Sequence, residues 1–375
     1  MTNDETYTLR VRRAAIMFPG REIVEDAAVV VHDGLVVQAG AWSDLKASCP
    51  ADVRDLGETT LLPGLVNAHG HLELSHLGLP PARMGGYLDW VRWLVAQPLG
   101  GTNPEAVARA AMQLLECGTA AVADIATRLP RLVAQGLDEA GIDYAIFFER
   151  FGYQGDAPLP DIDSERLALA GHALYSTSPE SLRAAKAWDT ARGKPFSIHL
   201  AEHEGETELL AAGTGAFADF MRERILPKDF IAPGLSPVAW ADALGLLDSR
   251  TLAVHAVHVS KSDIEILKGR GATVCLCPRS NEIIGVGRAP ARALLDAGVP
   301  CCLGTDSLAS APDLNLFEEL SALLAFCPLS PHEALSLLGP VPARALGFHR
   351  LGRLAPGSPA RFAVLPTDLE AALFD

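Results

Sequence analysis

Short apolar runs alternate with helical stretches along most of the chain, starting near residue 60. The runs are apolar throughout, which is typical of strands that are buried on both faces of a parallel sheet. Eight such units spread over about 290 residues match a (β/α)8 barrel in number and size. The pattern therefore predicts an α/β protein of the TIM-barrel type, with strands at residues 61–68, 119–124, 142–148, 172–175, 196–200, 252–255, 273–277 and 300–304.

A doubly wound sheet is the competing arrangement for alternating strands and helices. Such a sheet usually carries a glycine-rich GxGxxG turn after its first strand. Pro63–Gly64 and Gly70 do not form that turn, so the barrel is favoured.

Several helix starts are visible in the sequence. Asn103, Ser178 and Ser330 each precede a proline. A polar residue followed by proline is typical of a helix N-cap and first helical position, and Glu333 adds the spacing of a capping box. We therefore expect helices to begin at these three points.

The two ends of the chain are β-rich instead. Apolar residues 27–32 and 35–39 flank Asp33–Gly34, and Asp-Gly between two apolar runs is a strong hairpin signal. The tail, residues 353–366, is again β-like after a Pro-Gly turn. These segments predict a small β structure outside the barrel.

Charge limits the partners. The 375 residues include 31 Lys+Arg and 46 Asp+Glu, a formal net charge of −15, and 49% of them are apolar. An acidic globular chain argues against nucleic acid or an anionic membrane as partner, because both require a basic face. A small-molecule substrate remains possible.

The N-terminus and the cysteines indicate the cellular compartment in which the protein is expected. Asp4 and Glu5 stand where a secretory signal would carry basic residues and an apolar run. The longest apolar runs are too short to cross a membrane. The seven cysteines lack CxxC spacing, which favours buried reduced thiols in a cytoplasmic protein.

Five residues that could bind a metal stand at the ends of predicted strands. His69 and His71 form an H-x-H pair, and side chains two apart in a strand point the same way. His199 closes the fifth strand, His255 closes the sixth, and Asp306 follows the eighth. A lone histidine is usually a core residue, and a lone Asp306 would be a helix N-cap. Five together on the active-site face of a barrel indicate a zinc or iron centre.

The number of metals depends on a bridging group. Two-metal hydrolases of this plan commonly use a modified lysine on the fourth strand, but residues 171–175 contain none. Lys186 and Lys194 fall on the following helix and its end. We therefore expect one divalent transition metal, zinc in preference to iron, with water completing the shell. The expected ligands are His69, His71, His199 and Asp306.

Glu202 stands three residues after His199. A carboxylate there can reach the water at the metal and carry its proton to the leaving group. His255 would orient that water and stabilise charge. The alternative is that Glu202 is a solvated loop acid beside Glu204 and Glu206.

Five segments carry a family resemblance that covers nearly the whole chain. In order they are residues 62–71 (LPGLVNAHGH), 199–202 (HLAE), 254–258 (VHAVH), 277–281 (CPRSN) and 303–307 (LGTDS). The sequence resembles the amidohydrolase superfamily, most of all its mononuclear deaminase branch. The resemblance implies a barrel at residues 59–347 and a small β-sandwich built from 1–58 and 348–375.

The resemblance also implies roles by position. It gives the same four metal ligands, with Glu202 as the proton shuttle toward a ring nitrogen and His255 as the residue that orients the water. Asp306 would also accept a proton from the water.

Two further residues are implied to bind substrate. His172, in GHALYS, resembles the histidine of a Pro-His-Ala-Pro-Tyr segment that lines the substrate pocket, although both prolines are absent here. Residues 71–76 and 87–90 resemble the aminodeoxyfutalosine deaminases. Glu73 shares strand parity with His69 and lines the pocket if the strand continues that far; otherwise it is a surface residue.

The function expected from this pattern is hydrolytic deamination of an aminopurine nucleoside-like substrate, with 6-amino-6-deoxyfutalosine as the best candidate and ammonia as product. The alternative is another C–N or C–Cl bond, as in a guanine-type deaminase, a cyclic amide or imidazolone hydrolase, or a chlorohydrolase. A non-catalytic relative is disfavoured because no expected ligand is missing. Relatives often dimerise, so a homodimer is also expected.

Overall fold

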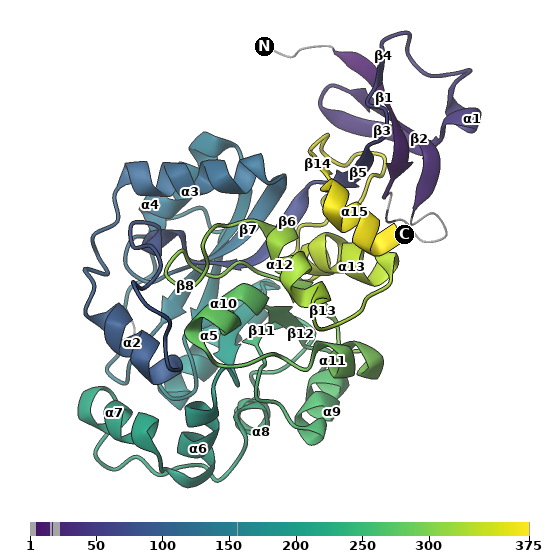
Figure 1. Cartoon of the computed structure of the whole chain (residues 1–375). Coiled ribbons are helices and arrows are strands. Elements are labelled where there is room, and N and C mark those ends of the chain that lie inside the picture. Colours follow the sequence, from purple (N-terminus) through teal and green to yellow (C-terminus); the bar gives the residue numbers. More distant parts are fainter. Residues whose placement is uncertain (1–4, 16, 18–22, 156, 375) are drawn as a thin grey trace.

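Eight parallel strands form one sheet in the computed structural model, which describes residues 5–15, 17, 23–155 and 157–374. The strands neighbour one another in chain order, and the helices surround them (Figure 1). The ring closes after the last strand, where the Asp306 N–H donates to the carbonyl of His69 at 3.0 Å and Asn67 Nδ2 donates to Thr305 Oγ1 at 2.7 Å. The predicted barrel is confirmed. Its strands are β6 (Leu65–Gly70), β7 (Thr119–Ala126), β8 (Asp143–Arg150), β9 (Leu167–Gly171), β10 (Phe196–Leu200), β11 (Thr251–His255), β12 (Thr273–Leu276) and β13 (Cys301–Leu303).

Two predicted strands were placed wrongly. The run 61–68 is divided at Gly64: β5 (Thr60–Pro63) joins a separate sheet, and β6 begins the barrel. The fourth strand is β9 rather than 172–175, which forms a turn. Leu167–Gly171 is selected because it pairs with β8 on one side and β10 on the other, an arrangement that local sequence does not specify.

The predicted helix starts at Asn103, Ser178 and Ser330 are confirmed, since each side chain accepts a backbone N–H of the first turn, and Glu333 completes a capping box. The helices are α1 (Trp42–Leu45), α2 (Tyr87–Val95), α3 (Pro104–Glu116), α4 (Pro130–Ala140), α5 (Pro179–Arg192), α6 (Glu204–Ala212), α7 (Ala216–Arg224), α8 (Pro237–Ala243), α9 (Lys261–Arg270), α10 (Pro278–Ile284), α11 (Ala291–Ala297), α12 (Leu316–Leu324), α13 (Pro331–Leu338), α14 (Pro340–Leu346) and α15 (Thr367–Phe374). A 3-10 turn, η1, covers Leu72–Leu74.

Both chain ends contribute to the separate mixed sheet. Its order is β14-β5-β1-β2-β3, with β4 paired to β1, and β14 runs antiparallel to β5. The hairpin at Asp33–Gly34 is confirmed: the two residues have φ of 50° and 70°, as a type I′ turn requires. The remaining strands are β1 (Thr6–Ala14), β2 (Val24–His32), β3 (Leu35–Ala41), β4 (Val53–Asp55) and β14 (Phe362–Val364).

The C-terminal helix α15 lies against this sheet (Figure 1). Its buried Glu370 accepts a hydrogen bond from Arg13 Nη1 at 2.9 Å and also contacts Arg12 and Thr60. This helix was not expected from the β-like tail. The division into 1–58 with 348–375 and 59–347 stays a proposal.

The other expectations concern cysteines and membranes. All seven cysteines are free and five are buried, whereas Cys49 and Cys117 are only half-buried. Within the described ranges, none of the helices combines the length and apolar character that a bilayer crossing requires. Asp4, part of the N-terminal segment considered above, lies outside the described residues.

Candidate metal centre

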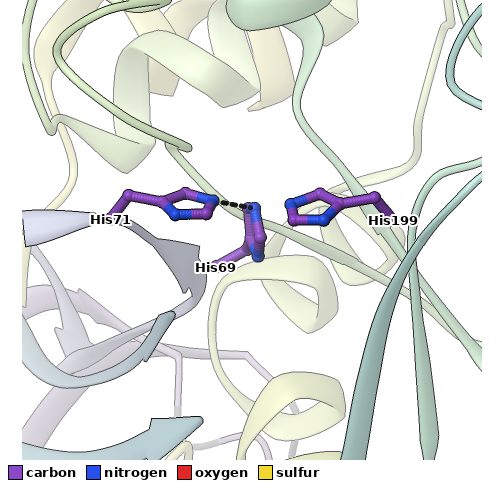
Figure 2. Close-up of side chains that lie close together, drawn as sticks. All are labelled: His69, His71 and His199. Atoms are coloured by element: carbon purple, nitrogen blue, oxygen red, sulfur yellow. Dashed lines mark hydrogen bonds between the residues drawn. The ribbon is translucent and has the colours of Figure 1, made fainter. Parts of the chain in front are cut away.

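The structure brings the five strand-end residues together at one rim of the barrel. His69 lies in β6 with His71 just beyond it, His199 lies in β10, His255 ends β11, and Asp306 follows β13. The ring centroid of His69 is 4.8 Å from that of His71, 5.0 Å from His199 and 5.9 Å from His255. In Figure 2, His71 and His199 flank His69 from opposite sides.

The donor atoms of this cluster are spaced as metal ligands are. His69 Nε2 and His71 Nε2 are 3.2 Å apart, and Asp306 Oδ1 lies 3.9 Å and 3.6 Å from them. Ligand atoms of His69, His71 and His199 all lie within 4.8 Å of one another. Ligands with zinc bonds of 2.0–2.1 Å are about 3.4 Å apart in a tetrahedral site. The residues therefore fit a metal ion of that size.

Their protonation states also suit a metal. Burial, reinforced by the neighbouring imidazoles, lowers the pKa of His69 well below its usual value and lowers that of His199. Burial likewise lowers the pKa of His71. Burial alone would raise the pKa of Asp306, but the facing histidines and Ser280 lower it overall. Neutral imidazoles and an ionised carboxylate are the forms that coordinate metals.

Hydrogen bonds behind the cluster fix the ring orientations. His199 Nδ1 donates to the carbonyl of His172 at 2.8 Å, which leaves Nε2 with its lone pair. His255 Nδ1 lies 3.0 Å from Asn281 Oδ1, which sets the same tautomer. Such contacts fix the tautomer and the orientation of each ring at the site.

Backbone strain gathers at the same rim. Ala201, His255, Ala256 and Asp306 have φ of 53°, 74°, 46° and 58°. A non-glycine residue in this region costs of order 1–3 kcal/mol and persists only where its surroundings enforce it. The strand ends after β10, β11 and β13 therefore turn sharply and present their side chains to the cluster.

Glu202 is buried beside the cluster rather than solvated. It is 4% exposed, and its Oε1 lies 3.7 Å from His255 Nε2. Burial, and next the charge of Asp306, raises its pKa well above the usual range. Glu206, also buried, accepts the Glu202 N–H at 3.0 Å. Among Glu202, Glu204 and Glu206, only Glu204 is exposed. The alternative that Glu202 is a solvated loop acid is therefore wrong.

Glu73 lies in the cavity wall for a different reason from the one expected. The strand ends at Gly70, so the parity argument is wrong, and Glu73 lies in η1. Its carboxylate accepts the backbone N–H groups of Thr127, Arg128 and Leu129 at 2.9–3.2 Å. The side chain thus anchors the segment between β7 and α4. Its contact with substrate stays a prediction.

His172 follows β9 and lines the cavity. Its Nδ1 is 2.5 Å from Ser176 Oγ, its ring centroid is 5.1 Å from that of His199, and burial lowers its pKa to about 4. Its role toward the substrate is likewise still a prediction.

The cluster opens into a cavity of about 210 Å³. One wall carries the histidines and carboxylates. Helices α2 and α7 add a mostly apolar part of the lining, to which α7 also contributes Arg224; the apolar side chains are Trp90, Val91, Leu94, Phe217, Phe220 and Met221. The site can therefore hold a polar group at the cluster and an apolar group beyond it.

One cavity residue escaped the sequence analysis. Glu149 lies in β8, is 7% exposed and lines the cavity, and burial raises its pKa to about 7. It stands one residue beyond the predicted strand 142–148. The rule that singled out His199 and His255, a polar side chain at a strand's carboxyl end, could have found it.

A model of the amidohydrolase family matches residues 60–375. The chain belongs to the amidohydrolase family. The predicted family is thereby confirmed, and with it the expectation of an enzyme: this amidohydrolase is a metal-dependent aminohydrolase. Together with the histidine cluster, family membership assigns a divalent metal to the site.

Relatives of this amidohydrolase carry deaminase names. A 5-methylthioadenosine/S-adenosylhomocysteine deaminase of Nitratidesulfovibrio vulgaris strain Hildenborough is 30% identical over an alignment of 383 positions, which covers 94% of this chain and 81% of the relative. An aminodeoxyfutalosine deaminase of Deinococcus radiodurans is 29% identical over 323 residues, covering 78% and 74%. The Helicobacter pylori aminofutalosine deaminase, solved in complex with methylthio-coformycin, has a TM-score of 0.85 at 22% identity and covers 98% of this chain and 95% of its own.

Proposed function

We propose that this amidohydrolase hydrolyses the exocyclic C–N bond of an adenosine-like nucleoside and releases ammonia, with 6-amino-6-deoxyfutalosine as the candidate substrate. The observation that carries the proposal is the buried Glu202 carboxyl beside the three clustered histidines and Asp306. The deaminase names of the relatives support the reaction class.

The metal set proposed is one zinc ion held by His69, His71, His199 and Asp306. Three imidazoles and one carboxylate suit zinc, and they would also accept iron. β9, the true fourth strand, has the sequence LALAG and contains no lysine that could bridge a second ion. When bound, the ion supplies a Lewis acid that lowers the pKa of water toward neutrality.

Different residues around the cluster have different roles in proton transfer. Glu202 holds a proton at its carboxyl and can give it to a ring nitrogen, because its raised pKa favours the protonated form. His255 presents Nε2 toward Glu202, since Asn281 holds its Nδ1. Asp306, fixed by Ser280 Oγ at 2.6 Å, serves as the proton acceptor on the other side.

The shape of the cavity supports a nucleoside that carries an apolar group on its sugar. The purine's reacting carbon must lie at the cluster, near Glu202 and His255. The rest of the molecule then extends toward the mostly apolar lining from α2 and α7. Burying apolar surface there contributes about 25 cal/mol per Å², which favours substituted nucleosides over adenosine.

Turnover of a nucleoside panel tests the proposal. Protein of measured metal content is incubated with 6-amino-6-deoxyfutalosine, 5′-methylthioadenosine, S-adenosylhomocysteine and adenosine, and ultraviolet absorbance and ammonia are followed. We expect at least one of these four nucleosides to be deaminated. The nucleoside with the highest kcat/KM is taken as the preferred substrate. No deamination of any adenine compound, at full metal content, would overturn the proposal and favour another C–N or C–Cl bond.

A further inference from the structure

The carboxylate of Glu149 has one oxygen without a partner. Thr127 Oγ1 donates to Oε2 at 2.9 Å and fixes the group. Oε1 is buried, and no described residue donates a hydrogen bond to it. Leaving a buried acceptor unpaired costs free energy, so a donor from a bound molecule would be favoured there.

Neighbouring protein groups do not supply that donor. His199 Nδ1 lies 3.8 Å from Glu149 Oε1, but its hydrogen is given to the carbonyl of His172 at 2.8 Å. Arg150, the next residue, directs its guanidinium to the carbonyl of Ala157. The oxygen therefore stays available to a ligand in the cavity that Glu149 lines.

The other acids of the cavity are already engaged. The carboxylate of Glu73 accepts three backbone N–H groups, and Asp306 accepts from Ser280 and faces the histidines. Glu202 faces His255 beside the reacting centre. Glu149 is the acid left to recognise a part of the substrate that does not react.

The chemistry of the substrate identifies the donor, and this step rests on the proposed function. In an adenosine-like nucleoside the ring nitrogens N1, N3 and N7 accept hydrogen bonds. The donors shared by this class are the exocyclic amino group, which must lie at the metal cluster, and the sugar hydroxyls. We propose that Glu149 Oε1 accepts a hydrogen bond from a sugar hydroxyl, which makes Glu149 a specificity-determining residue for ribose.

A second cation is the competing occupant. Ligand atoms of Glu149, His172 and His199 lie within 4.8 Å of one another. The His199 nitrogen known to lie near Glu149 is Nδ1, 3.8 Å from Oε1, and a cation bound through it would displace the hydrogen that it donates to the carbonyl of His172. A hydroxyl leaves that hydrogen bond intact, so the geometry favours it.

The test compares adenosine with 2′-deoxyadenosine and 3′-deoxyadenosine, or the matching deoxy forms of the preferred substrate. Leaving a buried hydrogen-bonding oxygen without its partner discriminates by about 10- to 100-fold. We expect wild-type kcat/KM to fall by that factor when one of the two hydroxyls is removed. Glu149→Ala should abolish the difference, and Glu149→Gln, which keeps an acceptor, should restore part of it. Glu165→Gln, a control on an 87% exposed side chain, should leave the ratio unchanged.

Each other outcome refutes the inference. Equal kcat/KM for the ribo and both deoxy compounds in the wild type would do so without any variant. Full discrimination in Glu149→Ala would also refute it. A fall from two metal ions per chain in the wild type to one in Glu149→Ala would refute it as well, because it would assign Glu149 to a cation. If no adenine compound is deaminated, the proposed function fails separately. Nucleoside binding, followed by tryptophan fluorescence, then makes the same comparison, because Trp90 lines the cavity.

Discussion

Replacing Glu202 by Gln removes the group proposed to carry protons while disturbing little else. The amide has nearly the size of the carboxyl and keeps an oxygen acceptor toward His255, 3.7 Å away. The backbone at this point is held by Glu206, which accepts the Glu202 N–H at 3.0 Å. Folding and metal retention should therefore survive the change.

The loss of rate follows from the burial of the carboxyl. The side chain of Glu202 is only 6% exposed, so bulk water cannot readily replace it as proton carrier. General acid–base catalysis contributes about 10²–10⁴-fold. At 1.36 kcal/mol for each tenfold, kcat should fall by an amount equivalent to about 3–5 kcal/mol of barrier.

The assay measures kcat and KM with the preferred nucleoside and the metal content of the same samples. Glu204→Gln is the matched control, because it makes the same substitution two residues away on an exposed side chain. It should retain full activity. If Glu202→Gln holds its metal and keeps kcat within tenfold of the wild type, another group carries the proton and the reasoning fails.

Four further changes test the surrounding structure. Asp306→Ala should lower both metal content after dialysis and kcat; unchanged metal would remove Asp306 from the ligand set. Asn281→Leu should release the ring of His255 and cost about 10–100-fold in kcat at constant metal content, and unaltered kinetics would refute that role. Burial raises the pKa of Asp189 to about 8, so its contribution to stability is present at low pH and is lost as the pH rises from about 4 through 8. Urea unfolding at pH 5 and pH 8 should show a smaller loss of stability in Asp189→Asn than in the wild type; equal losses would contradict this. Gly304→Ala would place a Cβ 2.7 Å from that of His69, and calorimetry should show destabilisation of about 1–3 kcal/mol, whereas an unchanged Tm would count against the close packing.

The sequence by itself determined the barrel, and it predicted which polar side chains meet at one rim of it. Uniformly apolar strands alternating with helices specify a parallel sheet, and parallel strands end at the same face. A polar residue at the end of such a strand is therefore placed by local pattern alone. His199 and His255 were found in this way, although they are 56 positions apart in the chain.

Tertiary structure decided the features that depend on pairing between distant segments. β9 is a strand because β8 and β10 align with Leu167–Gly171, and neither neighbour is visible in its local sequence. Glu73 anchors the segment after β7 because η1 folds against it, which strand parity could not show. The helix α15 is fixed to β1 through Glu370 and Arg13, contacts that join the two chain ends.

The electrostatic state of the site was also a tertiary outcome. Glu202, Glu204 and Glu206 look alike in the sequence, yet two are buried and one is exposed. The unpartnered oxygen of Glu149 likewise exists only because the hydrogen of His199 is given to a carbonyl on a neighbouring segment. Local pattern fixes which side chains reach the rim of the barrel. Burial and hydrogen bonding, which depend on the whole fold, decide what each can do there.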